Sequence, residues 1–116
     1  MNTDANKAVV NRYFDIWNTG HVEGLDEVLS TTYVDHAHPE MKDVESIKQS
    51  VVKVRQAFPD FNIEVDSILS ESDLVAVRGI IRRTQNGKPS VSRVMWFVRI
   101  VNNQMTDLWT GTETST

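Results

Sequence analysis

Apolar residues recur at helical spacing in several segments before residue 60. The first segment, residues 4–18, predicts an amphipathic helix, since positions three and four residues apart share one helix face. Thr3 or Asp4 can cap the start of this helix, and Gly20 suits its end. Its apolar face consists of Ala5, Val9, Val10, Tyr13, Phe14, Ile16 and Trp17. Residues 22–30 predict a short second helix with its apolar residues turned inward.

A third helix is predicted between Asp43 and Pro59. Asp43 can cap its start, and proline stops a helix because it has no backbone N–H to donate. Valine, isoleucine and phenylalanine repeat there at spacings of three and four, which gives a single apolar face. Before this helix, residues 31–37 predict a short extended segment that ends at the His38-Pro39 break.

Beyond residue 60 the pattern changes to the two-residue period of β-strands. Residues 61–69 alternate apolar and polar positions, and the slip near residues 67–68 predicts a β-bulge. Residues 74–112 predict three further strands in an antiparallel meander. Tight turns are expected at residues 86–87 (Asn-Gly) and 102–103 (Asn-Asn), because Asn and Gly tolerate the left-handed backbone that such turns need.

This order of helices and strands predicts an α+β fold in a single domain that spans residues 1–116. Three N-terminal helices would pack on a curved sheet shaped like a cone, with a cavity between the helices and the concave face. The helix at residues 43–58 is expected to cross that face. Both faces of the strand at residues 74–84 carry apolar residues, so a monomer would expose one row to water. A homodimer through the outer face of the 74–112 sheet is therefore expected.

The composition excludes several classes of function. The chain has 116 residues, a net charge of −4 and no cysteine. The acidic balance disfavours nucleic acid as a partner, because phosphate binding needs a basic surface. Without cysteine there is neither a disulfide nor a thiolate site. No stretch reaches the length of a membrane span or a signal peptide, so a cytoplasmic location without membrane attachment is expected.

Several short motifs follow one another in a definite order. They are Asn11-Arg12-Tyr13-Phe14, Trp17-Asn18, Tyr33-Val34-Asp35-His36, Ala57-Phe58-Pro59-Asp60-Phe61 and Asp107-Leu108-Trp109. Together they resemble the SnoaL-like polyketide cyclases of the nuclear-transport-factor-2-like superfamily over almost the whole chain. The resemblance implies a cone-shaped α+β barrel with three N-terminal helices, often dimeric through its sheet, and a deep pocket for a small molecule.

The resemblance also implies where catalytic groups would lie. SnoaL-like cyclases use a His and an Asp on neighbouring strands as acid and base in an aldol ring closure. Gln85 and Trp96 occupy the corresponding positions here, and neither side chain transfers a proton near neutral pH. The resemblance therefore implies a pocket of this family that lacks the usual cyclase pair.

A second resemblance is to the steroid isomerases of the same superfamily. Residues 8–13 look like the first helix of those enzymes, whose tyrosine, here Tyr13, donates a hydrogen bond to the enolate. Their general base falls within residues 36–38 of this chain, where His36 and His38 are the candidates. Histidine suits this role because it exchanges protons near neutral pH.

Each of these candidates has a plainer explanation. Tyr13 can be a packing aromatic with its hydroxyl at the edge of the core. Asp35, His36 and His38 can be a solvated loop, since loops are commonly polar. A zinc site needs three protein ligands in a fixed geometry, and two histidines with a Glu40 in a loop are weak evidence for one, so neither a metal nor another cofactor is expected.

The remaining pocket predictions rest on large and polar side chains. Trp17, Trp96 and Trp109, with Asp35 and Gln85, are expected to line the pocket, although tryptophans dominate cores as well as pockets. The strand arginines are expected to face solvent or a dimer partner with their stems packed flat. The alternative is that one of them binds an anionic group in the pocket.

Two functions follow from these observations. One is a lyase or isomerase that removes a proton beside a carbonyl of a small apolar substrate, polyketide- or steroid-like. Tyr13 would polarise the oxygen, and His36 or His38 would be the base. The other is a non-catalytic pocket that binds a small apolar molecule or mediates association. The groups that face Tyr13 across the cavity distinguish the two functions.

Overall fold

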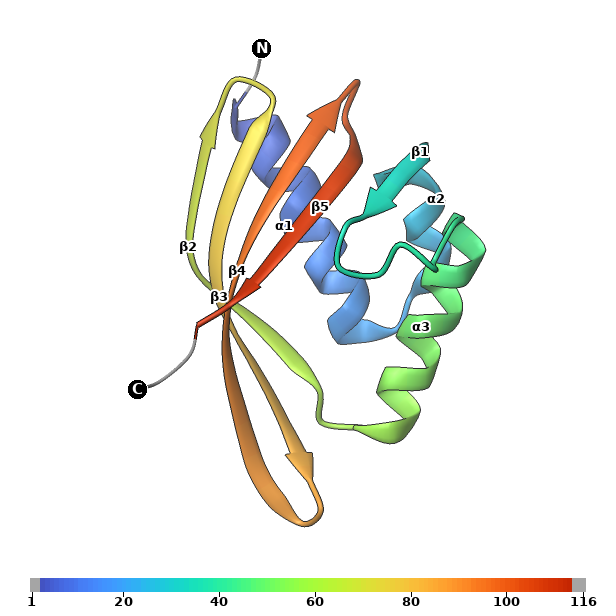
Figure 1. Ribbon diagram of the computed structural model, residues 1–116, viewed down its shortest axis with the longest axis vertical. Helices are drawn as coiled ribbons and strands as arrows, with labels where there is room; N and C mark the ends of the chain where they lie inside the picture. The colour runs from blue at the N-terminus through green and yellow to red at the C-terminus, as the bar shows by residue number, and fades with distance from the viewer. Residues whose placement is uncertain (1–2, 114–116) are drawn as a thin grey trace.

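The computed structural model describes residues 3–113 and places helices against one face of a curved sheet (Figure 1). The helices are α1 (Thr3–Thr19), the 3-10 helix η1 (Val22–Gly24), α2 (Leu25–Val28) and α3 (Val44–Ala57). The strands are β1 (Leu29–Asp35), β2 (Asn62–Glu71), β3 (Leu74–Gln85), β4 (Lys88–Val101) and β5 (Gln104–Thr112). The predicted α+β class is confirmed. No helix among residues 3–113 is long and apolar enough to cross a membrane.

The five strands form one sheet in the order β1-β5-β4-β3-β2. Strands β2 to β5 are antiparallel neighbours, and β1 joins β5 in parallel. A closed barrel needs its two edge strands to pair with each other. Here β1 and β2 are the opposite edges, so the sheet curves around α1 but does not close.

Both tight turns lie where the sequence predicts them. Asn86, Gly87, Asn102 and Asn103 have φ angles of 54°, 75°, 53° and 63°. Two consecutive residues with positive φ make the hairpin turn whose twist matches that of the strands it joins. The β-bulge is confirmed as well, because the register of β2 against β3 shifts between Val65 and Ser67.

The helix termini follow local chemistry, except where a strand competes. Asp43 Oδ1 accepts hydrogen bonds from Ser46 N at 2.8 Å and Ser46 Oγ at 2.7 Å, which cap α3. These bonds hold the pKa of the Asp43 carboxyl below its ordinary value. The second helix is shorter than predicted. The chain is extended from Leu29 onward because β1 pairs with β5 there, and tertiary pairing overrides local helical spacing.

Helix α1, and not α3, crosses the concave face of the sheet. α1 packs against β2, β3 and β5, whereas α3 contacts η1, α2 and β1. Figure 1 shows α3 farther from the sheet than α1, which corrects the expectation for residues 43–58. The reason is the size of the two apolar faces. α1 buries Val10, Tyr13, Phe14 and Ile16, and α3 buries Ile47 and Val51.

Polar side chains fasten α1 to the edge of the sheet. Asn18 Nδ2 donates to Ile63 O at 2.9 Å, and Asn18 Oδ1 accepts from Ile63 N at 2.7 Å. Arg55 of α3 donates to three backbone carbonyls around the end of α1 and the start of β2. Because buried backbone groups need partners, these bonds set where α1 lies on β2 and which of its side chains face the sheet.

Gly79 of β3 lies where the sheet leaves no room for a side chain. A Cβ there would be 2.8 Å from the carbonyl oxygen of Glu64 and 2.9 Å from Trp96 Cζ3. We expect Gly79→Ala to lower the free energy of unfolding by about 1–3 kcal/mol, the usual cost of overpacking. Gly111→Ala is the matched control, because its Cβ would meet only Met95 O, at 4.0 Å. Urea unfolding compares the two variants, and equal stability would contradict this prediction.

Candidate functional site

A cavity of about 430 Å³ lies between α1, α3 and the concave face of the sheet. Its wall is largely aromatic and includes Tyr13, Phe14, Trp17, Phe61 and Trp96. Phe14 packs on Trp96 with the ring centroids 4.7 Å apart, and Trp17 packs on Phe61 at 6.0 Å. A cavity of this size, lined by flat rings, suits a small apolar molecule.

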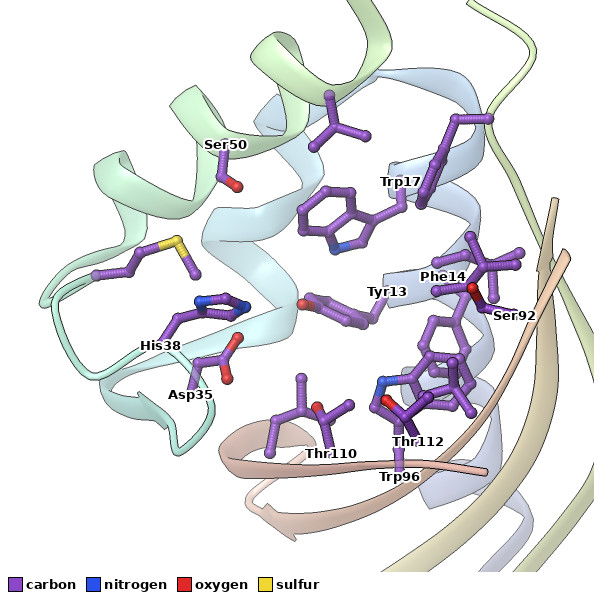
Figure 2. A pocket seen from close by; sticks show the side chains of 17 residues that line it. Tyr13, Phe14, Trp17, Asp35, His38, Ser50, Ser92, Trp96, Thr110 and Thr112 are labelled. Carbon is purple, nitrogen blue, oxygen red and sulfur yellow. The ribbon is translucent and has the colours of Figure 1, made fainter. Parts of the chain in front are cut away.

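Polar groups gather at one end of this cavity. Figure 2 shows the Tyr13 hydroxyl, the His38 ring and the Asp35 carboxylate turned toward that end, while the side of Phe14 and Ser92 lies opposite. No Lys or Arg is among the described residues that line the wall. The cavity thus offers a phenol, an imidazole and a carboxylate at one end, and a mainly apolar surface with a few hydroxyl groups along the rest.

Tyr13 projects from α1 into the cavity and is only 3% exposed. Burial raises the pKa of its hydroxyl to about 12, because a phenolate there would lack hydration. The neighbouring Trp17 and Tyr33 side chains oppose this effect, and the negative charge of Asp35 adds to it. Tyr13 therefore stays protonated at neutral pH and remains a hydrogen-bond donor.

Tyr33 of β1 is a second buried phenol near Tyr13. It is 6% exposed, and its hydroxyl is buried without a hydrogen-bond partner among residues 3–113. Burial, together with Tyr13 and Asp35, raises the pKa of Tyr33. Sequence reasoning did not single out Tyr33. The available signal is its position two residues before Asp35, on the same face of one strand.

Asp35 ends β1 and is a buried carboxylate, only 6% exposed. Its Oδ1 accepts a hydrogen bond from Ala37 N at 3.0 Å, which begins the turn after the strand. Its Oδ2 accepts no hydrogen bond from the described part of the chain. An accessible carboxylate oxygen on a largely buried residue can accept a hydrogen bond from a ligand or attract a cation.

His38 lies in the turn after β1 and directs its ring into the cavity (Figure 2). Its Nδ1 is 3.2 Å from Glu40 Oε1. When Nδ1–H donates to Glu40, Nε2 carries the lone pair and can accept a proton. The His38 side chain is 59% exposed, so it lies at the mouth, where it can exchange protons with water.

His36 lies on the convex face of the sheet. Its Nε2 is 2.9 Å from Asp107 Oδ1, and its ring stacks on Trp109 with the centroids 4.7 Å apart. Burial opposes the ionisation of Asp107, but hydrogen bonds from His36 and Thr106 outweigh it and lower the pKa of that carboxyl. His36 is thus part of a packed surface cluster with an ionised partner.

Three of the expected site residues therefore lie outside the cavity. Side chains of an extended segment alternate between faces, so His36 points away where Asp35 points inward, and Trp109 points away where Thr110 points inward. Gln85 is exposed at the end of β3, beyond the cavity, because the hairpin extends past the helices. Its expected place in the pocket wall is corrected with those of His36 and Trp109.

The other five expected residues do line the cavity: Tyr13, Trp17, Asp35, His38 and Trp96. Their chemical roles stay predictions. The wall also contains hydroxyl residues that sequence reasoning did not single out: Ser50, Ser92, Thr110 and Thr112. Strand and helix periodicity could have found them, since each shares a face with buried neighbours.

Residues 3–113 bring no three His, Asp or Glu side chains together as a metal site.

The fold and the cavity define a class of protein. A curved sheet with helices on its concave side, enclosing a small-molecule pocket, is the architecture of the nuclear-transport-factor-2-like proteins. Residues 7–110 match the family of SnoaL-like polyketide cyclases. The chain belongs to this family. No curated protein matches it.

Several solved structures share this fold. TsrD from Streptomyces laurentii superposes with a TM-score of 0.87 at 14% identity, covering 97% of this chain and 91% of that one. A SnoaL-like polyketide cyclase from Agrobacterium tumefaciens gives 0.83 at 16% identity, covering 98% and 94%. A loop-truncation variant of IdmH, from Streptomyces antibioticus, gives 0.80 at 24% identity, covering 93% and 92%. At these sequence identities the superpositions show a shared fold and nothing further.

The buried Tyr13 makes stability depend on pH in the alkaline range. Its folded pKa of about 12 lies above the ordinary value of 10.0, so its contribution is complete below pH 10 and is lost as the pH rises toward 12. As the pH rises from 9 to 11, the free energy of unfolding of the wild type should fall by about 1–2 kcal/mol more than that of Tyr13→Phe, because the variant lacks the phenol that ionises. Urea unfolding at both pH values measures this. Parallel pH profiles for the two proteins would contradict it.

Proposed function

We propose that this protein is a lyase or isomerase that removes a proton beside the carbonyl group of a small, flat, apolar compound, polyketide- or steroid-like in shape. One observation carries the proposal: Tyr13, Asp35 and His38 meet at one end of a cavity whose wall is otherwise mainly aromatic and aliphatic, with a few hydroxyl groups. Enolisation needs a hydrogen-bond donor for the carbonyl oxygen, a base for the α-proton and a wall that excludes water.

Tyr13 is the donor in this proposal. It is protonated at neutral pH because burial raises its pKa to about 12, and it needs no reorganisation to donate to an oxygen that gains negative charge. The edge of the Trp17 ring lies against Tyr13, with the centroids 6.5 Å apart, and limits the movement of the phenol. A donor held in place stabilises the enolate more than it stabilises the ketone.

His38 is the base. Its contact with Glu40 favours the tautomer in which Nε2 is free to take the α-proton. The nearby Asp35 carboxylate stabilises the imidazolium that forms, because opposite charges attract. Exposure at the mouth then lets His38 return the proton to the substrate or to water.

The proposal does not include aldol ring closure. Trp96 lines the cavity at one position where the family places a proton-transferring group, and its indole offers only an N–H donor. Gln85, at the other position, lies outside the cavity. These two placements support an enolisation that stops short of the cyclase step.

Proton exchange tests the proposal directly. The probe is 2-tetralone, a flat bicyclic ketone, in D2O, with loss of its α-proton signals followed by NMR. We expect wild-type protein to accelerate exchange, and Tyr13→Phe and His38→Ala each to lower the rate about a hundredfold, since general acid–base help contributes a factor of about 10²–10⁴. Asp35→Asn should lower it less than His38→Ala, because Asp35 acts through the imidazolium.

His36→Ala is the matched control for His38→Ala. It removes the same side chain two residues away, but from the convex face, where His36 contacts Asp107 and Trp109. We expect its exchange rate to stay within about twofold of the wild type. No exchange above buffer, or equal rates in the Tyr13 and His38 variants and the wild type, would overturn the catalytic proposal.

A second candidate function is binding of a small apolar molecule without turnover. The 59% exposure of the His38 side chain favours it, because a base that stays largely hydrated gains little from the cavity. The exchange experiment separates the two functions. If the protein binds 2-tetralone but does not accelerate its proton exchange, the catalytic function is rejected and the binding function is supported.

We also propose that the protein is a homodimer through the convex face of the sheet. Leu69, Val91, Met95 and Phe97 are exposed there, by 71%, 56%, 49% and 56%. We expect light scattering at micromolar concentration to report a dimer, and Phe97→Glu to convert it to a monomer, since a charge at the centre of an apolar interface is costly. Val52→Glu, at an exposed valine of α3, is the control and should stay dimeric. A monomeric wild type would contradict the proposal.

A further inference from the structure

Arg83 of β3 differs from most arginines of the sheet. Arg78, Arg82 and Arg99 form ion pairs with Asp66, Glu64 and Asp73 at 3.1 to 3.3 Å. The guanidinium groups of Arg83 and Arg93 form no ion pair or hydrogen bond within residues 3–113. Arg93 is exposed on the convex face, whereas Arg83 is half-buried on the concave face. Arg83 is therefore an unpaired cation on the side of the sheet that forms the cavity.

Arg83 is the next residue on the concave face of β3 after Ile81, a residue of the cavity wall. Ile81, two residues earlier on the same strand face, lines the cavity together with its partner Ser92 on β4. Two residues of a strand span about 7 Å, so Arg83 continues that wall toward the hairpin tip. Its guanidinium carbon is 5.0 Å from the centroid of the Phe58 ring. Stacking on an aromatic face holds the guanidinium in place at the rim.

The protein leaves the guanidinium of Arg83 without an acceptor. Arg83 Nε is fully buried and has no hydrogen-bond partner, a state that costs free energy. Asp60 is bonded to Thr84, whose N and Oγ1 donate to its two carboxylate oxygens at 3.0 and 2.6 Å, and it forms no ion pair with Arg83 within residues 3–113. The terminal nitrogens of Arg83 are not buried, so an acceptor from outside the chain can reach them.

The charges at the two ends of the cavity are opposite. The Asp35 carboxylate, which forms no ion pair within residues 3–113, lies at the polar end, and Figure 2 shows Ser92, on the strand that pairs with the Arg83 segment, on the other side. An anionic group on a ligand is repelled at the Asp35 end and attracted at the Arg83 end. The charges thus fix which end of an elongated ligand enters first.

We infer that Arg83 is a specificity-determining residue that binds an anionic substituent, such as a carboxylate, on the end of the ligand remote from Tyr13. The inference rests on the proposed use of the cavity for a flat carbonyl compound, and it adds the charge and position of a second functional group. A guanidinium presents two parallel N–H groups that match the two oxygens of a carboxylate. The ligand is then an apolar keto acid, with its ketone at Tyr13 and its acid group at the Arg83 end.

Two probes that differ only in the acid group test this inference. 2-Acetonaphthone and 6-acetyl-2-naphthoate share the flat ring system and the ketone, and only the second carries a carboxylate. Their affinities are measured by quenching of tryptophan fluorescence. We expect the wild type to bind the acid at least about tenfold more tightly than the ketone, and this preference to shrink as salt is raised.

Substitutions of Arg83 then separate recognition from packing. We expect Arg83→Gln to weaken binding of the acid at least about tenfold while binding of 2-acetonaphthone stays within twofold. Arg83→Lys should keep part of the preference, because the charge remains. Arg93→Gln removes an unpaired arginine from the convex face and should change neither affinity. Thermal unfolding of each variant shows whether the fold survives.

Three results would overturn the inference. The first is that the wild type binds both probes equally tightly, and the second is that Arg83→Gln keeps the preference for the acid. The third is that Arg83→Gln weakens the binding of both probes equally, which would mean that Arg83 only packs on Phe58. The measurement needs binding and not turnover. If the wild type accelerates proton exchange but shows no preference for the carboxylate, this inference alone is rejected. If it shows the preference but no exchange, only the catalytic proposal is rejected.

Discussion

The position of α1 across the concave face of the sheet is the constraint on which the rest of this structure depends. Asn18 satisfies both backbone groups of Ile63, as a neighbouring strand would, and Arg55 binds three carbonyls where α1, α3 and β2 meet. Buried backbone groups need hydrogen-bond partners, so these bonds fix the position of α1 relative to β2. With its C-terminal end held there, α1 turns Tyr13 and Trp17 into the cavity.

The cavity combines an apolar body with one polar end, and the chemistry follows from that asymmetry. Low hydration keeps the Tyr13 phenol neutral, with a pKa of about 12. The Asp35 carboxylate has one oxygen that no residue of the described part of the chain binds. A polar group removed from water interacts more strongly with the few partners that reach it. A ligand that brings an oxygen to Tyr13 and a flat apolar body to Trp17 and Trp96 satisfies both parts of the cavity.

Strand alternation separates two sets of residues with different roles. Within the segment 35–38, Asp35 and His38 reach the cavity, whereas His36 stacks on Trp109 on the convex face. The same rule places Arg83 on the cavity side, stacked on Phe58, while its neighbour Arg82 pairs with Glu64. Residues adjacent in sequence thus serve the pocket and the outer surface of the sheet independently.

The sequence by itself determined the elements whose causes are local. The Asp43 cap, the stop before Pro59, the two turns with positive φ and the bulge in β2 all follow from a few neighbouring residues. The motifs along the chain also gave the family, and five of the 17 residues that line the cavity were expected there. Only the tertiary structure decided which helix crosses the sheet, which histidine points inward and which arginine lacks a partner. These features depend on packing between distant segments, such as the pairing of β1 with β5 at Asp35 and Leu108, and no local pattern encodes such contacts.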